Sequence, residues 1–97
     1  MTGTLRSRAD VATASPQRYA KQLVSHLGHK VDVVTDGATS TLQLDGATGQ
    51  VVVGEAVITL LASAAEPAGL DLVEHVLGSH LVRFGARDEL TVTWQRS

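Results

Sequence analysis

The stretch KVDVVTDGATSTLQLDGATGQVVVGEAVITLLAS, residues 30–63, determines the fold. Apolar and polar residues alternate along much of it, and Asp-Gly pairs at 36–37 and 45–46 divide it. Alternation with period two is typical of strands with one buried face, and Asp-Gly favours tight turns because glycine adopts positive φ at little cost. The stretch therefore predicts an antiparallel meander of four strands: Lys30–Asp36, Thr39–Leu44, Gln50–Val53 and Ala56–Ser63.

A helix is predicted before the meander. Ser15-Pro16 is a good helix start, since serine caps free N–H groups and proline at the first position loses no useful donor. Apolar residues then recur every four positions from Tyr19 to Leu27. We expect the helix to end there, with Gly28 in the left-handed conformation.

A second helix is predicted after the meander, from Leu70 to Phe84, where apolar residues recur at helical spacing. The segment Glu66–Gly69 is read as a break before it, and Gly85 as its C-cap.

Two further strands are predicted near the ends of the chain, at Leu5–Thr13 and Glu89–Trp94. The element order is then β-α-β-β-β-β-α-β, an α+β fold. We expect a curved antiparallel sheet with both helices packed on one face, because they are the only available cover for it. The 97 residues suit a single domain, with residues 1–4 disordered.

Composition excludes several classes of function. Eight Lys and Arg against ten Asp and Glu argue against non-specific nucleic-acid binding. Cysteine is absent, which excludes disulfides and thiolate chemistry. No apolar run is long enough to cross a bilayer, and we expect a cytoplasmic protein. No nucleophile elbow or glycine-rich phosphate loop occurs, so an enzyme is the least favoured function.

The chain carries four histidines: His26, His29, His75 and His80. His26 and His80 each fall roughly 60° from the apolar stripe of their helix, in the same sense. On antiparallel helices the two rings either converge or both point outward; on parallel helices they cannot meet. With His29 they could bind a divalent metal ion, whereas a half-buried structural role is the plainer interpretation. His75 lies toward the opposite face as a bystander.

Cations lie near these histidines. Arg83 follows His80 by one turn, Arg87 comes one turn later, and Lys30 follows His29. Together with Tyr19 they are candidate ligand-binding residues for a carboxylate or phosphate. The alternative is a set of surface ion pairs with Asp88, Glu89 or Asp32.

Two segments carry a resemblance to a known family: residues 19–30, YAKQLVSHLGHK, and residues 80–94, HLVRFGARDELTVTW. The chain resembles, from about Arg8 to Trp94, the bacterial proteins filed as domain of unknown function 2218. The resemblance implies small cytoplasmic proteins and, since such domains accompany siderophore-interacting flavoproteins, some link to iron handling. The residues that match the family pattern are His26, His29, Lys30, His80, Arg83 and Arg87. The chain departs from it at Gly85-Ala86 and in the short turn near Gly46.

Three functions follow from these patterns. The first is a non-enzymatic module that binds a metal ion or an anionic, siderophore-like ligand in a groove between the helices. The second is an interaction domain that forms a homodimer, since a terminal strand would leave an open sheet edge. The third is a metal-dependent enzyme that uses the same histidines.

Overall fold

The computed structural model describes residues 4–97, and the element order expected from the sequence is confirmed. The elements are β1 (Leu5–Ala12), α1 (Pro16–Leu27), β2 (Asp32–Asp36), β3 (Thr39–Leu44), β4 (Ala47–Val53), β5 (Val57–Ala64), α2 (Pro67–Phe84), the short 3-10 helix η1 (Ala86–Asp88) and β6 (Gln95–Arg96). Of the segment expected to be disordered, residues 1–3 lie outside this description, and Thr4 is exposed next to β1.

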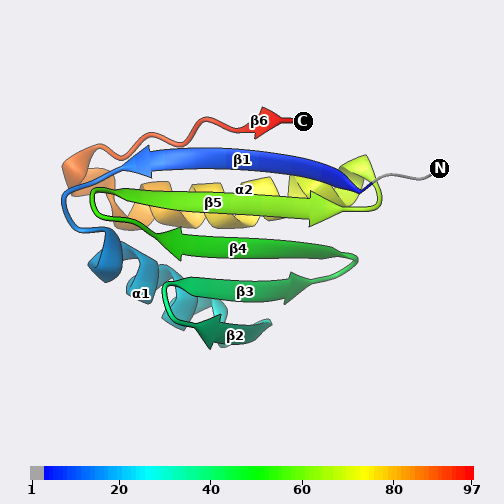
Figure 1. Ribbon diagram of the computed structural model, residues 1–97, viewed down its shortest axis with the longest axis horizontal. Coiled ribbons are helices and arrows are strands. Elements are labelled where there is room, and N and C mark those ends of the chain that lie inside the picture. The colour runs from blue at the N-terminus through cyan, green and yellow to red at the C-terminus, as the bar shows by residue number, and fades with distance from the viewer. Residues whose placement is uncertain (1–3) are drawn as a thin grey trace.

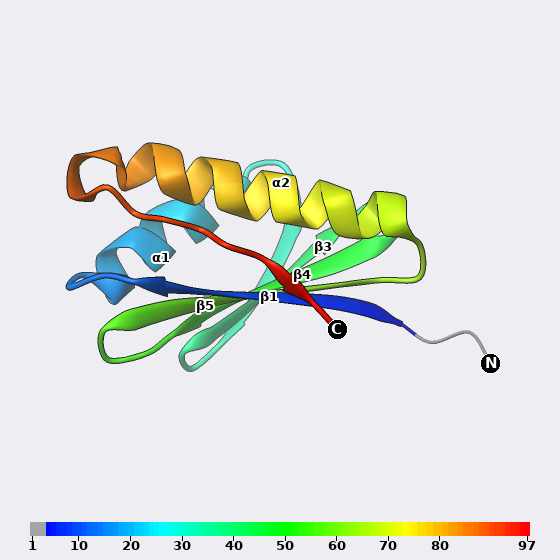
Figure 2. The same ribbon diagram turned by 90° about the horizontal axis from the view of Figure 1, so that it is seen from above.

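The strands form one antiparallel sheet in the order β2-β3-β4-β5-β1-β6. Both helices lie on the same face of it, as the alternation required, and Figure 2 shows the opposite face uncovered. They run in opposite directions: α1 leads away from the end of β1, and α2 returns over β5 and β1 (Figure 1). This direction decides which side chains of the two helices meet.

Two tight turns set the register of the meander. Gly37 and Gly46 have φ of 62° and 71°, values that a residue with a Cβ adopts at a cost. The turn at Asp45–Gly46 is so short that Ala47 pairs directly with Leu44. Strand β4 therefore begins at Ala47, three residues before the predicted start.

The core is aliphatic and lies between the sheet and the helices. Its fully buried side chains come from both layers: Val11, Leu23, Leu42, Val51, Ile58, Leu60, Leu70, Val73, Leu77 and Leu81. Helix α2 packs closely on β4, because a Cβ on Gly49 would stand only 3.0 Å from Leu77 and 3.1 Å from Val73. The helix axis is thereby fixed over the centre of the sheet.

The predicted left-handed Gly28 is wrong. Its φ and ψ are −63° and −15°, and its N–H donates to the Val24 carbonyl at 2.8 Å. Glycine suits this position for another reason: a Cβ would lie 3.0 Å from that carbonyl oxygen. The chain continues in turns, with the Lys30 and Val31 N–H groups donating to the Leu27 carbonyl, and β2 begins at Asp32 rather than at Lys30.

Helix α2 begins earlier than predicted. Pro67 occupies its first turn, so Glu66–Gly69 is mostly helix start rather than a break. Gly85 ends the helix as expected, with its N–H donating to the Leu81 carbonyl. With its 18 residues, α2 is the longer helix, and no helix within residues 4–97 is long and apolar enough to cross a membrane.

The predicted strand Glu89–Trp94 is wrong. Glu89 adopts φ 55°, and only Gln95–Arg96 pair with β1, opposite Ser7 and Arg8. Leu90 is buried against Gly85, where a Cβ would clash with its side chain at 2.2 Å. The segment is thus held by side-chain packing beside β1, and not by a ladder of hydrogen bonds.

Candidate functional site

The opposite directions of α1 and α2 bring His26 and His80 together. Their ring centroids are 5.1 Å apart, with the ring planes at 42°. The sequence left open whether the two rings converge or both point outward, and in the structure they converge. Phe84, one turn after His80, completes the cluster, with its ring centroid 5.3 Å from that of His26 and edge-on to it. The sequence analysis missed Phe84 in this role, although its spacing of four from His80 places both on one helix face.

A hydrogen bond orients the His80 ring. Its Nδ1 lies 2.7 Å from the Val76 carbonyl oxygen, which can only accept, so Nδ1 carries the proton. Nε2 is then the free nitrogen of the neutral ring, and it becomes a second donor when the ring is protonated. The half-buried His80 is thus held in place by its own helix.

The electrostatic surroundings of His26 are cationic. Partial burial lowers its pKa below the ordinary 6.5, and the positive charges of His80, Lys30, His29 and Arg83 lower the pKa further. The ring itself remains exposed. The site therefore combines two imidazoles with a local positive potential, at the end of α1 and along the last turns of α2.

The cations at this site are free of the ion pairs that the plainer interpretation predicted. Within residues 4–97, the salt bridges join Arg8 to Asp10 and Arg96 to Asp71 and Glu74. Lys30 and Arg83, whose charges act on His26, take part in none of these and are exposed. Arg87 is also exposed and takes part in none of these, but its charge acts on Tyr19 rather than on His26.

Asp88 has a different partner. The hydroxyl of the buried Tyr19 donates to its carboxylate, and this hydrogen bond raises the pKa of Tyr19 above 10.0. The Arg18 guanidinium lies 5.7 Å from the centroid of the Tyr19 ring. Tyr19 therefore joins α1 to η1, which is a structural contact. No local pattern could have predicted it, because the two residues are 69 positions apart.

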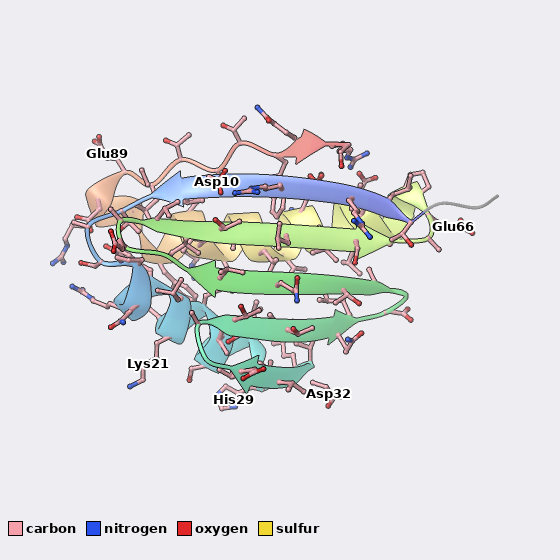
Figure 3. All side chains as sticks on the ribbon, in the orientation of Figure 1. Asp10, Lys21, His29, Asp32, Glu66 and Glu89 are labelled. Atoms are coloured by element: carbon pink, nitrogen blue, oxygen red, sulfur yellow. The ribbon has the colours of Figure 1, made fainter. Side chains whose placement is uncertain are left out.

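The metal site predicted at His26, His29 and His80 stays a prediction. Among residues 4–97, no three His, Asp or Glu side chains are placed to hold a metal ion. His29 lies on the exposed turn that follows α1, and Figure 3 shows it near β2 at the margin of the sheet. His75 is exposed on α2 and lines a separate hollow with Trp94.

Known proteins support both the fold and the family. The chain has the same fold as PA4090 from Pseudomonas aeruginosa, whose NMR structure superposes with a TM-score of 0.79. The two share 23% identity over 94% of this chain and 95% of that one. A comparison with curated proteins gave no match. The model of a family described as "Uncharacterized protein conserved in bacteria (DUF2218)" matches residues 8–95, a span that holds both helices and the imidazole pair. On that match, the chain belongs to the DUF2218 family.

Proposed function

We propose that this domain is a non-enzymatic binding module for a small anion with several charged groups, held at the helix pair by His26, His80, Lys30 and Arg83. One observation carries the proposal: two imidazoles lie 5.1 Å apart within a cluster of cations that form no ion pair among residues 4–97. An anion would supply the missing negative charge, and each of its charged groups could accept hydrogen bonds from the Nε2–H of a protonated imidazole or from the Arg83 guanidinium.

The orientation of the imidazoles supports binding rather than catalysis. His80 is oriented by a main-chain carbonyl, and within residues 4–97 no side-chain hydrogen bond holds His26. A general base is normally oriented by a further group, often a carboxylate, and is placed near a nucleophile or a bound water. An imidazole that only binds an anion through its charge does not need a further group to orient its ring.

The chemical class of the ligand follows from the same groups. Two imidazoles, an ammonium and a guanidinium on an open surface suit a ligand with several carboxylates better than a single small ion, because they come from α1, the turn after it and α2. The resemblance to domains that accompany siderophore-interacting flavoproteins favours a carboxylate-bearing iron chelate. Because the groups are exposed, we expect a dissociation constant on the order of 1 mM for a simple carboxylate such as citrate.

The test is a titration of the protein with citrate, followed by the NMR signals of the histidine rings. Citrate should raise the pKa of His26, because a bound anion stabilises the imidazolium, and binding should strengthen as the pH falls toward that pKa. His75 serves as an internal control. Arg83→Gln should weaken citrate binding severalfold, and Lys21→Gln, on the same helix layer, should not.

Two outcomes would contradict the proposal. In the first, His26 and His75 respond alike to citrate, as they would to ionic strength alone. In the second, citrate leaves the histidine signals unchanged while zinc binds metal-free protein and is lost in His80→Ala. The second result would instead restore a metal site built on the imidazole pair.

A further inference from the structure

The sheet face opposite the helices is uncovered in the described chain (Figure 1 and Figure 2). Figure 1 looks directly onto it, with α1 and α2 behind the sheet. The cross-strand register defines rows of side chains that all point to this face. One row consists of Arg6, Ser63, Thr48, Gln43 and Asp32; the next consists of Arg8, Leu61, Gln50, Thr41 and Val34.

Charge on this face is confined to its two sides. The middle strands β3, β4 and β5 present only uncharged side chains there, mostly half-buried: Thr39, Thr41, Gln43, Thr48, Gln50, Val52, Val57, Thr59, Leu61 and Ser63. A centre depleted of charged residues with charges at the rim is typical of protein interfaces.

The two sides carry opposite charge. Strand β1 presents two arginines and one aspartate, Arg6, Arg8 and Asp10, whereas β2 presents two aspartates and no cation, Asp32 and Asp36. Figure 3 shows Asp32 on β2 and Asp10 on β1, on opposite sides of the face. The face is therefore basic along one side and acidic along the other.

The two sides of the face also differ in shape, with a hollow on the basic side and a protruding side chain on the acidic side. A hollow of about 660 Å³ lies on the basic side, with Arg6, Arg8 and Leu61 among its lining residues. On the acidic side Val34 stands out from the surface, with 68% of its area exposed. A large apolar side chain on one side thus has a matching recess on the other.

We propose that a second copy of this chain packs face to face on this surface, with a two-fold axis parallel to β4. Strand β4 is the middle of the five strands from β2 to β1, so this axis exchanges the two sides. Arg6 of each copy then lies opposite Asp32 of the other, and each Val34 faces the hollow beside Arg8 and Leu61 of the other copy.

Other arrangements fit less well. A two-fold axis across the strands would set Arg8 against its own copy and Asp32 near Asp36. With the axis along β4, the one unfavourable pair is Asp10 with Asp36, and Asp10 already bonds to Arg8 at 3.2 Å. Pairing of β2 with a second β2 would place Asp32 opposite Asp36, a like-charge contact that protects this edge from extension.

The area limits the strength of the dimer. Five strands about 4.8 Å apart and roughly 20 Å long give a face of about 500 Å² per copy, at the low end for specific interfaces. We therefore expect reversible association in the micromolar to submillimolar range. The proposal is independent of the anion site, which lies on the other side of the sheet.

A charge-swap experiment tests both the surface and the axis. Arg6→Glu and Asp32→Lys, each alone, should weaken self-association at least about tenfold, because each sets like charges together at two symmetric positions. Mixing the two variants should restore a dimer. The two introduced charges, which are of opposite sign, then face each other across the interface, and the native Asp32 of one copy faces the native Arg6 of the other.

Analytical ultracentrifugation measures each variant alone and the mixture. Lys21→Glu and Glu89→Lys, on the helix side, are the matched charge controls and should associate like the unmodified chain.

Val34→Ser provides a variant that removes the apolar contact and adds no charge. It should also weaken self-association, and because residue 34 is exposed, circular dichroism should show the fold unchanged. A chain that stays monomeric at millimolar concentration would overturn the proposal, as would a mixture of the two charge variants that fails to associate. A dimer broken by the helix-side controls and not by the sheet-side variants would also overturn it.

Discussion

The imidazole rings of His26 and His80 stand 5.1 Å apart, although the two residues are separated by four strands of the sheet in sequence. Two groups that can each become positively charged are thereby held in mutual contact beside Lys30 and Arg83. Because of this contact, the protonation of His26 is sensitive to changes in α2.

Replacing His80 with glutamine should raise the pKa of His26. The charge of His80 would be lost, while the bulk of glutamine keeps most of the burial that is the larger cause of the lowered pKa. The pKa should therefore move toward 6.5 without reaching it. Histidine NMR titration measures the change. His75→Gln, on the exposed side of α2, should leave the pKa of His26 where it is, and an unchanged value in both variants would contradict the assigned coupling.

Tyr19→Phe should destabilise the fold by about 1–2 kcal/mol, because the Asp88 carboxylate loses the hydroxyl that donates a hydrogen bond to it. Since the hydrogen bond raises the pKa of Tyr19 in the folded state, its contribution is present at neutral pH and is lost as the pH rises through that pKa. Denaturant unfolding gives the free-energy difference. Arg18→Gln removes the cation–π contact and keeps the hydroxyl, and it should cost less than Tyr19→Phe; a Tyr19→Phe variant as stable as the unmodified chain would contradict the role of the hydroxyl.

Arg96→Gln should loosen the C-terminal strand rather than unfold the domain. Arg96 bonds to both Asp71 and Glu74 on α2, and water screens these ion pairs because Arg96 itself is exposed, so they contribute little to the stability of the domain. The ion pair lowers the pKa of Glu74 below 4.5, so the difference between the two proteins should disappear as the pH falls through that lowered pKa. Amide exchange of Ser97, whose N–H donates to Arg6, reports the loosening at neutral pH. Exchange that is unaffected would mean that side-chain packing alone holds the segment.

Gly49→Ala should destabilise the domain by about 1–3 kcal/mol, because the new Cβ would stand 3.0 Å from Leu77 and 3.1 Å from Val73, and both side chains would have to shift. Gly37→Ala meets no atom within 4 Å and should cost only about 1 kcal/mol, from its φ of 62°. Thermal unfolding of both variants separates close packing from backbone strain. If Gly37→Ala were the more damaging, the close approach of α2 to β4 would not be limiting.

The sequence placed the two histidines on their helices but did not predict how they are arranged relative to each other. Helical spacing alone placed His26 and His80 at equal offsets from their apolar stripes, but it could not choose between converging and diverging rings, because that depends on how the helices lie on the sheet. His29 shows the same limit. A spacing of three from His26 suggests a shared site, whereas the turn at Gly28 takes His29 onto an exposed loop.

By itself, the sequence determined the alternating meander, its two glycine turns, the first helix from Pro16 to Leu27 and the single covered face, since each depends on residues that are close along the chain. Only the tertiary structure decided that residues 89–94 form no strand and that the helices run in opposite directions with their imidazoles touching. β-branched residues favour a strand there, but the packing of Leu90 on Gly85 holds the segment away from the β1 ladder. The burial of an apolar side chain can outweigh the strand preference of its neighbours.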